Sequence, residues 1–292
     1  CGRSRRAVGV NCRRMLSNEQ SQAVAIAREA GKVLLEIYAT EFSVDFKGKG
    51  QNDPVTEADR RANALIVSRL HDAFPEDGII AEESENSLSV LSRRRIWYVD
   101  PLDGTKEFVA KNGEFSVMIG LAVDGRAQLG VVLQPSEDLL YAGVVGQGAW
   151  VEQAGVRRAL AVSTLAQTSA LSIIVSRSHR PRATDALMQR LGIQRESVSG
   201  SVGLKAGQIA QRAADLYVHM SDKSSAWDTC APEALLIAAG GRFTDLAGDP
   251  IAYGVPDLRT RRGILACNSA AFDAVLPVVR DLAAQSGMLT PP

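Results

Sequence analysis

Cysteine is scarce in this chain of 292 residues, and none of the four cysteines forms a CxxC pair. Disulfide frameworks and cysteine-based zinc sites depend on paired or closely spaced cysteines. Two of the four, Cys230 and Cys267, lie in segments whose apolar character predicts burial. The sequence therefore predicts free thiols, without a disulfide framework or zinc site, and we expect a cytoplasmic protein.

The sequence also lacks an apolar run of about 18 residues, so it predicts no transmembrane segment. It has no excess of charge, because its 33 lysines and arginines equal its 33 aspartates and glutamates. This balance argues against a nucleic-acid polymer or an anionic membrane surface as the main partner. Hydrophobic residues make up 46% of the chain, which is enough for a sizeable core.

No internal repeat and no low-complexity linker divides the chain. Residues 1–14 are basic, contain no aromatic residue and precede the first methionine, so we expect a disordered extension there. Its apolar stretch is too short for the hydrophobic region of an export signal. We expect residues 15–165 to form an α+β half and residues 166–292 an α/β half, with the site in the cleft between them.

Apolar spacing predicts a first helix from Ser17 to about residue 39, and a second from Thr56 that ends before Pro75. Strands with short connections are predicted at residues 78–81, 96–99, 115–123, 128–134, 139–145 and 149–152. Most of this sheet should be antiparallel. Beyond residue 166 the pattern alternates between strands (171–175, 215–219, 242–245 and 263–267) and helices (182–191, 201–213, the segment after 228, and from 270).

Residues 100–108, DPLDGTKEF, directly follow the predicted buried strand at residues 96–99. Asp100 and Asp103 are three residues apart on what should be a tight turn, so both carboxylates can face one point. Such a pair is costly unless a cation lies between them, and Mg²⁺ prefers carboxylate, carbonyl and water oxygens. The alternative is an ordinary Asp-Pro and Asp-Gly turn that binds nothing.

Three other segments accompany this motif: DPVTEAD at residues 53–59, EES at residues 82–84 and WDT at residues 227–229. In this order and spacing the four segments resemble the Mg²⁺-dependent, lithium-sensitive phosphatase family of inositol monophosphatase and the 3'(2'),5'-bisphosphate nucleotidases. The resemblance extends from about Ser17 to about Leu282. It implies a layered αβαβα sandwich with α/β and α+β parts, as in inositol monophosphatase and fructose-1,6-bisphosphatase.

The resemblance also implies a set of metal ligands. Glu82, Asp100 and the backbone carbonyl of Leu102 would hold a first Mg²⁺. Asp100 would bridge to a second ion, whose ligands Asp103 and Asp228 complete, and about two or three ions are expected in all. Taken singly, Glu82 could be a surface acid and Asp228 a helix N-cap. A capping carboxylate nevertheless has a second oxygen that can bind a metal.

Thr105 and Asp59 are similar to the family's water-activating pair. A threonine hydroxyl can accept a hydrogen bond from water while it donates its own hydrogen to a carboxylate. The alternative for Asp59 is structural, because Thr56-x-x-Asp59 has the spacing of a capping box. Gly104 lets the backbone approach an anion closely, so we expect the amides of Gly104 and Thr105 to cradle the phosphate.

Features of the substrate side are closer to the nucleotidases than to the inositol phosphatases. These are KEF at residues 106–108, SRSH at residues 176–179, and GS at residues 200–201 followed by Lys205. The resemblance implies that Lys205, Ser201 and His179 bind a second, non-reacting phosphate or the adenine side of the substrate. Each has an ordinary alternative: a solvated helix lysine, a helix cap and a loop histidine.

The predicted reaction is the hydrolysis of the 3'-phosphate of adenosine 3',5'-bisphosphate to AMP and phosphate by activated water, a step that the resemblance connects to sulfur assimilation. An inositol-phosphate or sugar-phosphate phosphatase is the alternative, because these enzymes share the metal motifs. A further alternative is a catalytically inactive metal- or nucleotide-binding regulator, although none of the ligands or the Thr105 and Asp59 pair is missing. The oligomeric state, monomer or homodimer, stays open.

Overall fold

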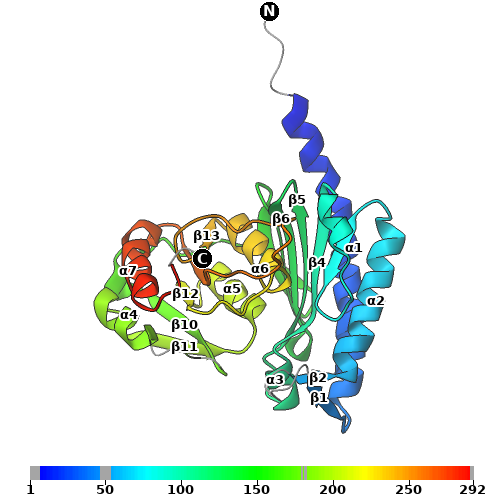
Figure 1. The fold of residues 1–292 in the computed structure, drawn as a ribbon, viewed down its shortest axis with the longest axis horizontal. Coiled ribbons are helices and arrows are strands. Elements are labelled where there is room, and N and C mark those ends of the chain that lie inside the picture. Colours follow the sequence, from blue (N-terminus) through cyan, green and yellow to red (C-terminus); the bar gives the residue numbers. More distant parts are fainter. Residues whose placement is uncertain (1–6, 47–53, 179, 181–182, 290–292) are drawn as a thin grey trace, which may run out of the picture.

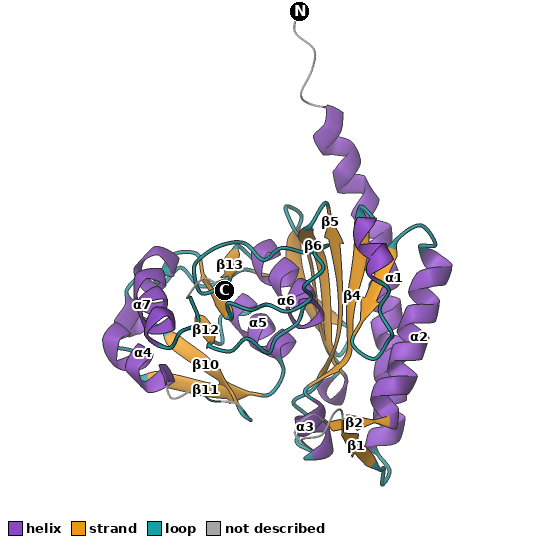
Figure 2. Ribbon diagram, viewed as in Figure 1, coloured by secondary structure: helices purple, strands orange, loops and turns teal. Residues whose placement is uncertain are grey.

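The computed structural model describes residues 7–46, 54–178, 180 and 183–289, and its elements are stacked in five layers (Figures 1 and 2). One face of a seven-stranded sheet is covered by α1 (Ala7–Tyr38) and α2 (Glu57–Ala73). The other face packs on α5 (Val202–Ala210) and α6 (Ala226–Ala238), which separate it from a five-stranded sheet. The outermost layer is α4 (Ala183–Leu191) and α7 (Phe272–Gln285). The predicted αβαβα sandwich is confirmed.

The seven-stranded sheet follows the chain in order. Its strands are β3 (Gly78–Ala81), β4 (Arg95–Asp103), β5 (Ser116–Val123), β6 (Arg126–Gln134), β7 (Leu139–Val144), β8 (Gly148–Gln153) and β9 (Val156–Leu160). β3 is parallel to β4, and every later pair is antiparallel, as expected. The edge strand β9 has mostly exposed residues, so the sequence offered no alternation of apolar and polar residues to predict it.

The five-stranded sheet has the strand order β11-β10-β12-β14-β13. Its strands are β10 (Ser172–Ser176), β11 (Arg195–Ser199), β12 (Leu216–His219), β13 (Gly241–Thr244) and β14 (Ile264–Asn268). β10 is parallel to both β11 and β12, whereas β14 is antiparallel to its two neighbours. The polar edge strand β11 was not predicted. Two short elements complete the region near the site: the hairpin of β1 (Val44–Phe46) and β2 (Pro54–Thr56), and α3 (Thr105–Val109).

Central strands of the seven-stranded sheet are buried on both faces. Along β4, Trp97 and Val99 belong to the core beneath α1 and α2, while Tyr98 faces the core around α5 and α6. Side chains alternate across a strand, so a strand between two helical layers reads as a continuous apolar run. This is why residues 96–99 were easy to identify as a buried strand.

Helix α6 lies unusually close to the sheet. Gly120 and Gly130 are register partners on β5 and β6. A Cβ atom at Gly130 would lie 2.0 Å from the carbonyl oxygen of Ala231, and one at Gly120 would lie 2.6 Å from its amide nitrogen. Any side chain at these two positions would push the helix away, so the glycines fix where α6, and the acidic residue at its start, stand against the sheet.

The first helix begins at Ala7, ten residues before the expected start at Ser17. Residues 7–16 contain no proline, so no residue there blocks the helical hydrogen bonds. The structure thus places residues 7–14 of the expected extension in a helix, while residues 1–6 lie outside the described residues. No described helix is long and apolar enough to cross a membrane. Cys230 and Cys267 are free and buried.

Candidate active site

Strand β4 carries two of the predicted acidic ligands. We expected the strand to end at Val99, but it continues to Asp103, with a shift of register against β5 between Asp100 and Asp103. Pro101 lies within this irregular stretch, where a missing amide hydrogen is tolerated. The Leu102 amide donates a hydrogen bond of 2.9 Å to Oδ1 of Asp100. The irregular stretch therefore replaces the predicted tight turn.

Asp228 comes from the other part of the chain, at the start of α6. Its Oδ2 accepts a 2.7 Å hydrogen bond from the Ser225 amide, and the two residues form a capping box. The capping role considered as an alternative is therefore present. Asp228 also lines the same pocket as Asp100 and Asp103, so helix capping and a place in the site are combined in one side chain.

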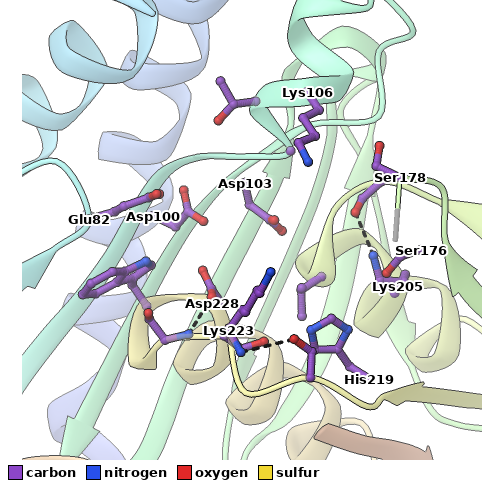
Figure 3. Close-up of a pocket in the computed structure, with 18 of the residues that line it drawn as sticks. Glu82, Asp100, Asp103, Lys106, Ser176, Ser178, Lys205, His219, Lys223 and Asp228 are labelled. Atoms are coloured by element: carbon purple, nitrogen blue, oxygen red, sulfur yellow. Dashed lines mark hydrogen bonds between the residues drawn. The ribbon is translucent and has the colours of Figure 1, made fainter. Parts of the chain in front are cut away.

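These side chains meet in a pocket of about 930 Å³ that is lined from both sheets (Figure 3). Glu82, which directly follows β3, also faces this space. The predicted site residues that line the pocket are Glu82, Asp100, Leu102, Asp103, Gly104, Thr105, Lys205 and Asp228. Carboxyl groups from three separate segments of the chain therefore share one concave site, which is where ligands usually bind.

The pocket is electrostatically costly for its carboxylates. Asp100 is only 2% exposed, and burial, followed by the charges of Glu82, Asp103 and Asp228, raises the pKa of Asp100 well above its usual range. Burial also raises the pKa of Asp103, although Lys205 and hydrogen bonds oppose the rise. A group of acids that cannot all ionise unaided is the environment that a cation would stabilise.

The donor set fits a hard divalent ion, since all its members are carboxylate or carbonyl oxygens. Among the described residues, no group of three or more acidic, histidine or cysteine side chains is arranged to hold a metal ion as it stands. The structure thus provides an acidic pocket with the right ligand chemistry, and the carboxylates would have to move together to enclose an ion.

Thr105 and Asp59 are joined by a hydrogen bond in which Oγ1 of Thr105 lies 3.2 Å from Oδ1 of Asp59. The same hydroxyl lies 3.2 Å from the Leu102 carbonyl oxygen. Oδ2 of Asp59 accepts hydrogen bonds of 2.7 Å from both the amide and the hydroxyl of Thr56. Asp59 therefore caps α2 with one oxygen and faces Thr105 with the other. Burial raises the pKa of Asp59, and the bonds from Thr56 lower it.

Gly104 joins β4 to α3 with a backbone φ of +97°. This left-handed region is accessible to glycine without strain. A Cβ atom there would also lie 3.0 Å from the carbonyl oxygen of Glu114. Gly104 thus turns the chain sharply enough to place Thr105, the first residue of α3, at the pocket wall.

Ser201 and Lys205 lie next to Asp103 and interact with its carboxylate. The Ser201 hydroxyl donates a 2.5 Å hydrogen bond to Oδ2 of Asp103 and accepts one from the Leu204 amide, so it caps α5. Lys205 is fully buried, its Nζ donates to the Gly200 carbonyl at 2.8 Å, and burial lowers its pKa to about 8. Both side chains hydrogen-bond to other groups of the protein. His179 lies outside the described residues.

Four further cations line the pocket and were not among the predicted site residues: Lys106, Arg180, Lys223 and Arg259. Lys223 precedes Asp228 by five residues, and Arg259 comes from a distant loop. Figure 3 shows Lys223 and Lys106 extending into the space beside the carboxylates. Arg259 reaches the site because it pairs with Ser225 in an isolated antiparallel bridge. No local motif marks such a residue, since its place depends on tertiary contacts alone.

A five-layered sandwich with an acidic pocket at strand ends defines a recognisable class of enzyme. The sequence profile of the inositol monophosphatase family matches residues 15–283. The chain therefore belongs to the inositol monophosphatase family, as its motifs predicted.

Similar proteins within this family include nucleotidases and inositol monophosphatases. Over 233 residues the chain is 35% identical to the 3'(2'),5'-bisphosphate nucleotidase CysQ of Escherichia coli (strain K12), covering 80% of this chain and 92% of the relative. The crystal structure of CysQ from Bacteroides thetaiotaomicron matches with a TM-score of 0.72 and 30% identity, over 87% of this chain and 98% of that one. Inositol monophosphatase from Anabaena matches with a TM-score of 0.71 and 26% identity, over 91% and 96%. The protein is thus a phosphatase of the CysQ and inositol monophosphatase type, in a family that is generally metal-dependent.

Proposed function

We propose that this phosphatase requires Mg²⁺ and removes the 3'-phosphate of adenosine 3',5'-bisphosphate, giving AMP and inorganic phosphate. The observation that carries the proposal is the pocket in which Glu82, Asp100, Asp103 and Asp228 surround one space beside the Thr105–Asp59 hydrogen bond. The CysQ nucleotidases among the relatives support the choice of substrate. The two free, buried thiols support a cytoplasmic enzyme.

Residues for two ions are available in this pocket. Glu82, Asp100 and the Leu102 carbonyl would hold one, and Asp103 and Asp228 would hold the other, with Asp100 shared between them. When bound, Mg²⁺ supplies a lowered pKa for water and charge stabilisation on the phosphate oxygens. The raised pKa of Asp100 supports this assignment, because a cation would offset the repulsion that causes part of it.

The Thr105 hydroxyl orients the attacking water. When the hydroxyl donates its hydrogen to Asp59, its oxygen can accept a hydrogen bond from water. Asp59 is held in place by its two bonds from Thr56, so the acceptor does not have to be ordered during the reaction. The amides of Gly104 and Thr105 are proposed to receive the reacting phosphate. Lys106 and Lys223 add positive charge beside it.

Hydrolysis of inositol monophosphates is the second candidate. It is favoured by the similar fold match to inositol monophosphatase from Anabaena. The metal pocket would serve either substrate, because both present a phosphate monoester. The choice depends on the wall formed by residues 176, 178, 200 and 205, which would face the non-reacting part of the substrate.

The test is phosphate release from adenosine 3',5'-bisphosphate by protein stripped of metal with a chelator. We expect no release without added ions and saturable activation by Mg²⁺. Release that is unchanged after complete removal of divalent ions would overturn the metal requirement. Full Mg²⁺-dependent activity on other monoesters with none on the nucleotide would overturn only the substrate.

A further inference from the structure

We propose that Glu107 is a positioning residue that fixes the substrate wall of the pocket to the catalytic turn. This inference rests on the proposed function, since it concerns the side of the same pocket that faces the non-reacting part of the substrate. Glu107 is 4% exposed and lies in α3, two residues after Thr105. It therefore stands where a contact can couple the reaction centre to the opposite wall.

The contact that Glu107 makes crosses from one part of the chain to the other. Its Oε1 accepts a 2.5 Å hydrogen bond from the hydroxyl of Ser178, which is 71 residues away. Ser176 is the last residue of β10, Ser178 lies two residues beyond it, and both line the pocket. A hydrogen bond to a charged carboxylate is among the stronger kinds. Glu107 thus holds the segment that follows β10 against α3.

An ion pair joins the same two segments of the chain. Arg177 donates two hydrogen bonds to the Glu114 carboxylate, at 2.7 and 2.6 Å. The Arg177 amide also donates to the Ser199 carbonyl oxygen at 3.2 Å. Arg177 is exposed, so this pair should contribute less than the part-buried hydrogen bond between Ser178 and Glu107. This pair also connects the segment after β10 to the region of α3, because Glu114 follows α3 in the chain.

Gly200 shows how tightly these segments are packed. A Cβ atom at Gly200 would lie 2.4 Å from Cγ of Glu107 and 2.7 Å from the carbonyl oxygen of Glu114. Nζ of Lys205 donates a hydrogen bond of 2.8 Å to the Gly200 carbonyl oxygen. The Glu107 side chain therefore fits between Ser178 and Gly200. A residue larger than glycine at position 200 would fill the space that the Glu107 side chain occupies.

Loss of this contact should affect substrate binding more than the chemistry. Glu107 is not one of the acids proposed to hold metal, and it donates nothing to the reacting phosphate. Without it, the segment at residues 176–178 is held to the region of Thr105 by the exposed Arg177–Glu114 pair and is positioned less firmly. A substrate that contacts this wall should bind more weakly, while one that fills only the phosphate site should react as before.

The experiment compares two substrates, adenosine 3',5'-bisphosphate and p-nitrophenyl phosphate, in kcat and KM. The variants are Ser178→Ala, which removes the donor, Glu107→Gln, which keeps an acceptor, and Gly200→Ala, which fills the space. Ser269→Ala, an exposed serine bonded to a backbone carbonyl outside the pocket, is the matched control. Calorimetric binding of the nucleotide without divalent ions gives a readout independent of turnover.

We expect Ser178→Ala and Gly200→Ala to raise the KM and the dissociation constant for the bisphosphate about tenfold. Their kcat/KM for p-nitrophenyl phosphate and their Mg²⁺ activation should stay within about twofold of wild type. Glu107→Gln should lie closer to wild type than Ser178→Ala. Equal losses on both substrates, or none on either, would overturn the inference. A wild-type enzyme that prefers another large monoester would overturn the proposed nucleotide, and the same comparison with that ester would still decide the role of Glu107.

Discussion

Replacing Thr105 by valine separates the proposed water-orienting hydrogen bond from the structural contacts around it. The substitution removes one hydroxyl and keeps a similar shape. The hydroxyl lies 3.2 Å from Asp59 Oδ1 and 3.2 Å from the Leu102 carbonyl oxygen. Asp59 keeps both hydrogen bonds from Thr56 in the variant, so α2 remains capped.

The expected magnitudes differ for activity and stability. Positioned acid–base groups contribute about 10²- to 10⁴-fold to rate, which is roughly 2.7–5.5 kcal/mol of transition-state stabilisation. The hydroxyl has one hydrogen to share between two long contacts, so its loss should lower the free energy of unfolding by only about 1 kcal/mol. For a protein of this size that is a shift in Tm of about 2 °C.

The assay is Mg²⁺-dependent phosphate release, with Tm measured on the same samples. Thr105→Val should lose at least about a hundredfold in kcat, and Thr105→Ser, which keeps the hydroxyl, should recover most of it. A valine variant that keeps more than about a tenth of wild-type kcat would show that this hydroxyl does not orient the water.

Two more substitutions test the pocket and the middle layer. Asp100→Asn should abolish turnover and, without divalent ions, raise Tm, because one of four mutually repelling acids is gone. Asp72→Asn, exposed on α2, should do neither, and an active Asp100→Asn enzyme would exclude the bridging role. Burial raises the pKa of Glu233 to about 8, from 4.5, so its contribution to stability is complete below about 4.5 and is lost as pH rises through about 8. Wild type should therefore lose up to about 1.4 kcal/mol of unfolding free energy per pH unit in that window relative to Glu233→Gln. Parallel pH profiles of the two proteins would show that Glu233 ionises normally.

The sequence predicted elements whose signals are local. Residues 96–99 read as a buried strand because both faces of β4 are covered, and the capping-box spacing at Thr56 located the start of α2. The edge strands β9 and β11 were not predicted, because an edge strand with a solvated face need not be apolar. The extension of β4 through Pro101 was also not predicted, since a shift of register depends on the pairing with β5.

The same division applies to the site. Asp100 and Asp103 were found from one motif, and their neighbours from the order of the segments. The burial of Lys205 beneath the pocket could not be predicted, because it follows from how α5 packs between two sheets. Lys223 and Arg259 enter the wall through loops that only the tertiary structure brings together. Sequence patterns therefore located the acids, while the shape and the cationic part of the pocket required the fold.

The most direct test of the proposed function is phosphate release with Mg²⁺ on adenosine 3',5'-bisphosphate, inositol 1-phosphate and fructose 1,6-bisphosphate, compared by kcat/KM. We predict a preference of about a hundredfold or more for the nucleotide, equivalent to about 2.7 kcal/mol of differential transition-state binding. A preference for inositol 1-phosphate or fructose 1,6-bisphosphate would contradict the proposed substrate.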